Sequence, residues 1–175
     1  GTNTISRFTV ASTGGTIAWK AIDFNINKSA ATLIGGLTGT GSVTAGTIVG
    51  LYDGITLIPG TFTSSADLGS GATSGSLRFE ATNEQQIAAG APKTYELKVN
   101  ITGVGASGTH IMSNIANDTI QNGGIPVAYA SVPGDSKFVW SDMSAQGHSE
   151  TTLDWTNGYL VKNLPLNTQT LTVSN

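Results

Sequence analysis

The chain has 175 residues, the size of a single domain. Only 11% of its residues are charged, against about 25% in an ordinary soluble domain, and the net charge is −3. This charge balance lacks the basic surface of nucleic-acid-binding proteins, so we expect no nucleic-acid partner. The absence of cysteine excludes disulfides, thiol nucleophiles and thiolate metal sites. No apolar run approaches the roughly 18 residues of a membrane helix, so no transmembrane segment is predicted.

The start of the chain, Gly1-Thr2-Asn3, has neither a Met nor a charged and then apolar leader. We interpret it as the start of a secreted protein whose signal peptide has been removed. Removal of an expression tag is the alternative. The composition, low in charge and rich in Thr and Gly, is typical of extracellular β-proteins and favours an extracellular or cell-surface location.

Apolar and polar residues alternate along most of the chain, between turns rich in Gly, Asn and Pro. This pattern indicates antiparallel β-structure. Phe8 and Val10 belong to the first predicted strand, and 17–26 form the second. The apolar positions of the second strand change parity, which predicts a β-bulge near Lys20-Ala21. Asp53-Gly54 is a hairpin signal between the next two strands.

The middle of the chain contains a loop, a short helical turn and a central strand. Residues 63–76 are almost free of large side chains, which predicts an exposed loop. Residues 83–89 resemble a capping box ended by Gly90, and predict one or two helical turns. Tyr95 to Ile101 gives the cleanest alternation in the chain, so we expect it in a central strand.

The C-terminal third continues the β pattern. Strands are predicted at 127–129 and 138–140, and the turn Asn157-Gly158 lies between two aromatic residues. A last short strand contains Leu171 and Val173. We therefore expect residues 1–175 to form a single all-β domain, an immunoglobulin-like antiparallel β-sandwich of about seven to ten strands with one short helical turn.

The run FVWSDMSAQGHSETTLDWTNGYLVKNLP, residues 138–165, resembles the closing segment of a family of surface-layer-like proteins. Those proteins are β-sandwiches rich in Thr, Ser and Gly, from uncultivated small-genome bacteria. The matching elements are Trp140-Ser141-Asp142, the run from Asp154 to Tyr159, and Leu164-Pro165. The resemblance implies a surface location and a structural or adhesive role, and it supplies no catalytic residues to transfer. Many relatives contain several modules, so a lone module implies attachment by polymerisation.

Both ends of the chain are extended and prone to β-structure. A sandwich with an unfilled edge can be completed by a strand from the next copy, and repetition of this contact builds a filament. We therefore predict a homopolymer, a pilus-like filament or surface layer built by donor-strand exchange, with 1–12 as the favoured donor arm. The alternative is that both strands pair within their own domain. The candidate donor side chains are Ile5, Phe8, Val10, Leu171 and Val173.

The sequence offers little that could carry catalysis. Neither His110 nor His148 has a histidine or carboxylate neighbour at ligand spacing, and no G-x-S-x-G turn is present. We therefore predict that the protein is not an enzyme and has no cofactor. A loose group of acids contains no calcium-loop motif, and we interpret its members as solvated loop residues, with calcium left open. These acids are Asp135, Asp142, Glu150 and Asp154.

A cell-surface adhesive or carbohydrate-binding module is the alternative function. Trp155 and Tyr159 flank a turn, where aromatic rings could stack on surface glycans. Packing of these rings in the core or an interface is the competing interpretation. Asn27, Asn100 and Asn117 begin N-glycosylation sequons, and their use depends on the source.

Overall fold

The structure is a computed structural model that describes residues 2–30, 32–37, 39–46, 48–102 and 109–173. Thirteen strands lie in this part of the chain, ten of them four residues or longer, together with two short 3-10 helices. They are β1 (Thr2–Val10), β2 (Ile17–Lys28), β3 (Leu33–Ile34), β4 (Gly41–Thr44), β5 (Val49–Asp53), β6 (Thr56–Leu57), β7 (Gly60–Ser64), β8 (Ser74–Ile87), β9 (Lys93–Thr102), β10 (Thr109–Asn114), η1 (Gln121–Gly124), η2 (Tyr129–Ser131), β11 (Phe138–Ser141), β12 (Trp155–Thr156) and β13 (Gln169–Val173).

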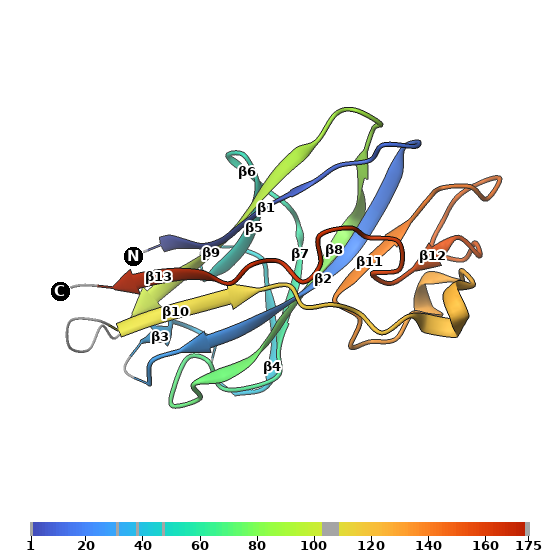
Figure 1. The fold of residues 1–175 in the computed structure, drawn as a ribbon. Helices are drawn as coiled ribbons and strands as arrows, with labels where there is room; N and C mark the ends of the chain where they lie inside the picture. Colours follow the sequence, from blue (N-terminus) through green and yellow to red (C-terminus); the bar gives the residue numbers. More distant parts are fainter. Residues whose placement is uncertain (1, 31, 38, 47, 103–108, 174–175) are drawn as a thin grey trace.

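Two antiparallel sheets pack face to face as a sandwich (Figure 1), which confirms the predicted fold class. The smaller sheet has the order β1-β9-β5-β6, and the two-residue β3 also pairs with β9. The larger sheet has the order β12-β11-β2-β8-β7-β4. β10 also pairs with β2, beyond the end of β11, and carries β13 on its outer side. Both chain ends lie at the same end of the sandwich.

Trp19 on β2 and Tyr95 on β9 join the two sheets in the centre of the core. Both side chains are fully buried, and their rings meet edge to face with centroids 5.1 Å apart. The indole N–H of Trp19 donates a hydrogen bond to the Tyr95 hydroxyl at 3.2 Å. Burial raises the pKa of Tyr95 to about 12. The Tyr95 hydroxyl that accepts the hydrogen bond from Trp19 therefore stays protonated across the physiological pH range.

β2 is buried on both of its faces, because the segment 127–156 covers the outer face of the larger sheet. Ala18 and Ala21 form a second apolar cluster there with Val139 and Trp155. Lys20 lies on β2 between them and is also buried. The C-terminal third of the chain therefore adds a small second core outside the sandwich.

Several local predictions are confirmed. The ladder between β2 and β8 shifts register between Trp19 and Ala21, which is the expected bulge. β5 and β6 form a hairpin, and Gly54 in its turn has a φ of 61°. β9 lies between β1 and β5, in the central position expected from its alternation.

Three local predictions are wrong in whole or in part. Residues 63–76 form a loop only between the end of β7 and the start of β8, and Leu68 in this loop is fully buried rather than exposed. Residues 83–89 do not form a helical turn, because β8 continues as a strand to Ile87 and pairs there with β2. The ladder supplies the backbone partners that a helix would otherwise provide, so tertiary pairing overrides the capping pattern. Residues 127–129 form no strand: Val127 makes an isolated bridge to Trp155, and η2 begins at Tyr129. Within the described ranges, no helix has the length and apolarity to span a membrane.

Tyr95→Phe should destabilise the fold by about 1–3 kcal/mol, because the buried indole N–H of Trp19 loses its acceptor while the ring packing is retained. The free energy of unfolding in urea measures this loss. Tyr52→Phe is the matched control, since the half-buried ring of Tyr52 packs under Lys98 and bridges no sheets. Equal stability of Tyr95→Phe and the wild type would contradict the structural role of this bond.

Candidate functional site

β1 is the edge strand of the smaller sheet, and its apolar side chains lie in the core of its own chain. Ile5 and Phe8 retain 3% and 7% of their surface, and Val10 packs half-buried against the same core. β1 pairs with β9 at eight positions, across a bulge between Thr4 and Ser6. The first donor candidates are therefore deeply integrated into their own sandwich.

β13 also pairs within its own chain, but it is attached less extensively. It pairs with β10 at five positions, and Leu171 packs half-buried against the core. The backbone of Val173 lies opposite Thr109. In this monomer both terminal strands thus adopt the intramolecular pairing considered as the alternative to exchange.

The Gln169 side chain joins β13 to β1 across the edge where the two sheets meet, here called the seam. Its Oε1 accepts a hydrogen bond from Arg7 N at 2.7 Å, and its Nε2 donates to Arg7 O at 2.8 Å. Nε2 also lies 3.4 Å from Ser6 Oγ. The amide therefore satisfies the free backbone edge of β1 at one residue, as a neighbouring strand would.

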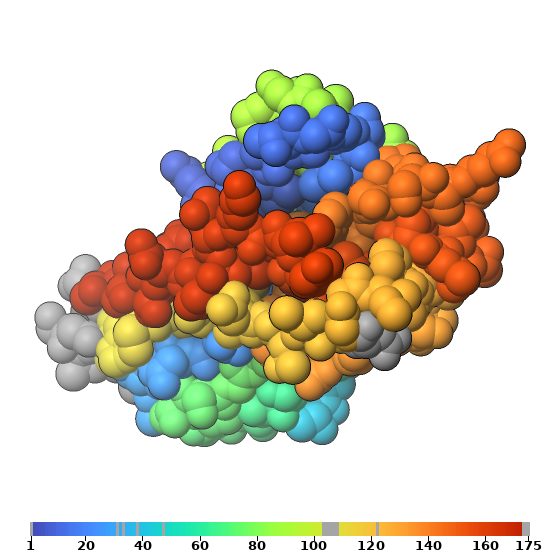
Figure 2. Space-filling model, turned by 45° about the vertical axis from the view of Figure 1, so that its right-hand side comes forward, coloured from blue at the N-terminus to red at the C-terminus, as the bar shows by residue number. Residues whose placement is uncertain are grey.

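Residues 160–173, here called the C-terminal strap, run along the same seam. Figure 2 shows the strap in red, crossing this face between the blue N-terminal strands and the yellow β10. A backbone hydrogen bond of 2.9 Å from Leu166 N to Ile115 O holds its middle. Leu160 and Asn163 have positive φ angles of 62° and 66°, a conformation that asparagine tolerates but that costs energy for leucine. Four apolar side chains of the strap pack against the main core: Val161, Leu164, Leu166 and Leu171.

A groove of about 500 Å³ remains beside the strap, at the edge of the sandwich formed by β1. Its lining is mainly apolar and comes from the β1–β2 turn region, β11 and the strap. Exposed Asp142 and Lys162 supply one negative and one positive charge to it. Its volume lies within the range of ligand-binding pockets.

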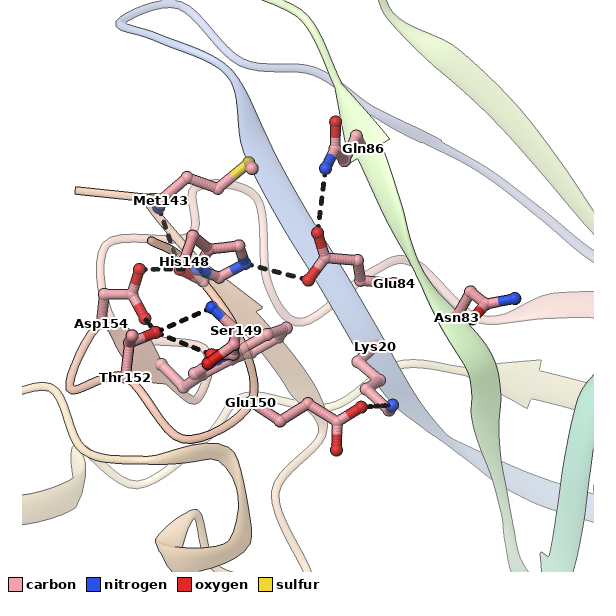
Figure 3. A network of polar contacts seen from close by, with 12 residues as sticks. Lys20, Asn83, Glu84, Gln86, Met143, His148, Ser149, Glu150, Thr152 and Asp154 are labelled. Atoms are coloured by element: carbon pink, nitrogen blue, oxygen red, sulfur yellow. Dashed lines mark hydrogen bonds and ion pairs between the residues drawn. The ribbon is translucent and has the colours of Figure 1, made fainter. Parts of the chain in front are cut away.

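His148 is the centre of a polar network that fastens the 142–154 loop to the larger sheet (Figure 3). Its Nδ1 lies 2.7 Å from Asp154 Oδ2, and its Nε2 lies 2.9 Å from Glu84 Oε2 on β8. The Asp154 side chain is fully buried and also accepts a hydrogen bond from Thr152 Oγ1 at 2.7 Å. The imidazole packs against the ring of Trp155, with centroids 5.3 Å apart.

Two carboxylates favour the charged form of this imidazole. Burial lowers the pKa of His148, but hydrogen bonds to Asp154 and Glu84 raise it, and the net shift is upward. Burial also disfavours the charged form of Asp154 and so raises its pKa. Hydrogen bonds from Thr152 and His148 lower this pKa, and the net shift is downward. Because carboxylates occupy both ring nitrogens, neither nitrogen can act as base for a nucleophile in this arrangement. The geometry is that of a structural clamp.

Sequence spacing indicated no histidine or carboxylate neighbour for either histidine, but the tertiary fold brings two carboxylates to His148. His110 lies on β10, with Nδ1 3.1 Å from Ser29 Oγ. The loop acids also separate: Glu150 pairs with Lys20, whereas Asp142 accepts a hydrogen bond from Ser144 N at 3.1 Å. Over the described ranges, no group of three or more His, Cys, Asp or Glu residues is placed to hold a metal ion.

The proposed glycan-stacking pair is not available as a platform, because Trp155 is fully buried. Its indole N–H donates to Ser149 O at 2.8 Å, and only Tyr159 keeps a half-buried ring beside the turn. The competing interpretation of Trp155, packing within the fold, is therefore correct. Of the sequon asparagines, Asn27 and Asn117 are exposed, whereas Asn100 is half-buried on β9.

Comparison with known proteins adds no relative: no protein-family model, no curated protein and no solved structure matches the chain. The site therefore rests on its own geometry. Sequence reasoning missed two residues of this site, Gln169 and Glu84. Gln169 lies in the predicted last strand, but nothing in a lone amide predicts a bond 162 residues away. Glu84 lies within residues 83–89, where the capping pattern predicts a helical turn. The strand that forms there instead places Glu84 beside His148.

His148→Leu should destabilise the protein by about 1–3 kcal/mol near pH 6, because Asp154 stays buried without its cationic partner. The raised pKa of His148 means that its stabilisation is complete below the unfolded-state pKa and is lost as pH rises through the folded-state pKa. The cost of the substitution should therefore shrink at pH 9. Urea unfolding at both pH values measures it, with His110→Gln as the control. A cost independent of pH would argue against a charged clamp.

Proposed function

We propose that the protein is an extracellular structural subunit that self-assembles by exchanging its C-terminal strap between copies. The observation that carries this proposal is the way the seam is closed. The C-terminal strap covers it with apolar side chains and pairs with β10 through a short ladder. A segment supplied by a neighbouring chain can make the same contacts. Exchange of this kind completes each sandwich and links the chains at the same time.

The C-terminal strap is better suited to exchange than β1. Its side chains are half-buried and β13 pairs at five positions, whereas β1 buries Ile5 and Phe8 and pairs at eight. Leu160 marks the start of the strap with a backbone conformation that is costly for a leucine, and an opened chain can relax it. This assignment favours the C-terminal donor over the N-terminal arm 1–12.

Low charge supports the same function. With only 11% charged residues, neighbouring copies repel one another weakly. The charged groups Lys20, Asp23 and Asp154 are moreover buried inside the fold. A surface location agrees with this composition and with the resemblance of residues 138–165 to surface-layer-like proteins.

A pair of cysteines should report the exchange directly. Met112 and Thr170 face each other on β10 and β13, and such pairs have Cα atoms about 4.5–5.5 Å apart, a spacing that a disulfide spans. The chain has no cysteine of its own. We therefore expect chains with Met112→Cys alone, mixed with chains with Thr170→Cys alone, to form disulfide-linked heterodimers on oxidation. Non-reducing denaturing gels measure them.

The matched control uses Thr9 and Thr94, whose hydroxyls lie 2.9 Å apart across β1 and β9. The corresponding mixture, Thr9→Cys with Thr94→Cys, should stay unlinked because β1 does not leave its own chain. Linkage of this pair alone would transfer the donor role to the N-terminal strand. Failure of both mixtures, with single monomers by electron microscopy, would refute assembly by strand exchange.

Gln169→Ala should accelerate exchange without changing its end point. The substitution removes the amide contacts to Arg7 and Ser6, so the closed strap opens more readily. The same contacts are lost from the exchanged form, and the equilibrium therefore stays nearly constant. The rate of heterodimer formation in the Met112→Cys and Thr170→Cys mixture measures this effect, and an unchanged rate would show that the amide does not restrain the strap.

A further inference from the structure

Ile55 is an exposed apolar side chain at the tip of the β5–β6 hairpin. It is 97% exposed, although the chain buries most of its other isoleucines. The turn itself does not require it: Gly54 has the positive φ that begins a type II′ turn, and the following position accepts polar residues equally well. The hairpin therefore presents an apolar knob that has no role in its own fold.

The groove beside the strap has the opposite character. It is a concave, mainly apolar site of about 500 Å³. Leu160 stands at its rim with 72% of its surface exposed. The apolar wall of the groove is built mainly from Phe8, Val10, Ile17, Trp140, Leu160 and Leu164.

The knob and the groove lie at opposite edges of the same sheet. The order of the smaller sheet is β1-β9-β5-β6, so the hairpin tip belongs to one outer edge and the groove adjoins the other. Ile55 is exposed and does not line the groove of its own chain, whereas the two surfaces of different copies are free to meet. We propose that the tip of the β5–β6 hairpin, centred on Ile55, inserts into the groove of a second copy of this chain.

The charges around both surfaces suit this contact. Beside the hairpin tip, Asp53 and Lys93 carry one negative and one positive charge, 3.4 Å apart. At the groove, Asp142 and Lys162 again provide one of each sign. Docking can therefore bring each charge of the hairpin tip to a charge of opposite sign at the groove. A small knob with a charged rim gives a weak contact that becomes effective by repetition.

The contact is heterologous, because different surfaces of the two copies meet. Such contacts leave a free knob at one end and a free groove at the other, and so they propagate into an open chain. This inference extends the proposed assembly by naming a second subunit contact, but it does not require the strap to be exchanged. The groove is complete in the closed monomer.

Sedimentation at increasing protein concentration tests the contact. The weight-average mass of the wild type should rise with concentration, and Ile55→Asp should raise the dissociation constant by about tenfold or more. Leu160→Asn should do the same, because asparagine tolerates a positive φ while losing the apolar side chain. Ile125→Asp and Leu153→Asn, at exposed apolar positions outside the groove lining, are the matched controls.

Cross-linking gives the geometry. Chains with Thr56→Cys, beside the intact Ile55, mixed with chains with Thr13→Cys, in the groove lining, should form heterodimers with a short bismaleimide, whereas Thr56→Cys with Leu153→Cys should not. A wild type that stays monomeric at high concentration, or equal effects of the test and control substitutions, would overturn the inference. Failure of strap exchange alone would give a different result. The mixture of Met112→Cys and Thr170→Cys chains would remain unlinked, while the contact between the hairpin tip and the groove would still form.

Discussion

The seam between the two sheets is the constraint on which the rest of this structure depends. The smaller sheet ends at β1 and the larger sheet at β10 and β13, so the apolar space between them must be closed at this edge. The C-terminal strap closes it by placing four apolar side chains over the core and one amide on the free backbone of Arg7. The strap is held by half-buried apolar side chains and by a ladder of five positions to β10. The segment that completes the sandwich is therefore the one that we propose a neighbouring copy replaces.

Side chains replace missing ladder partners at several places outside the regular sheets. Asp118 accepts hydrogen bonds from three backbone N–H groups, those of Lys137, Phe138 and Gly158, and thereby holds the start of β11 beside the turn after β12. His148 performs a comparable task between the 142–154 loop and β8. In a chain with so few charges, these groups are used largely for internal fastening. Little charge is left over to keep copies of the protein apart, which favours the assembly proposed above.

Polar groups of the C-terminal third fasten segments of the fold to one another. His148 is held between two carboxylates, and Glu150 pairs separately with Lys20. The large aromatic rings serve the core in the same way, since Trp19 joins the sheets and Trp155 supports the outer cluster. The surfaces proposed above for interaction are the seam, the groove beside it and the tip of the β5–β6 hairpin.

The sequence by itself determined the features that depend on neighbouring residues. Alternation between Tyr95 and Ile101 placed β9 correctly, the parity change near Lys20 located the bulge, and Asp53-Gly54 located a hairpin. Tertiary structure decided what depends on distant partners. Residues 83–89 became strand because β2 lies beside them, Trp155 became buried because the outer face of the sheet was covered, and His148 gained its carboxylates from two separate segments. The pairing of both chain ends was decided in the same way, because a strand pattern specifies which face is apolar but not which backbone it will join.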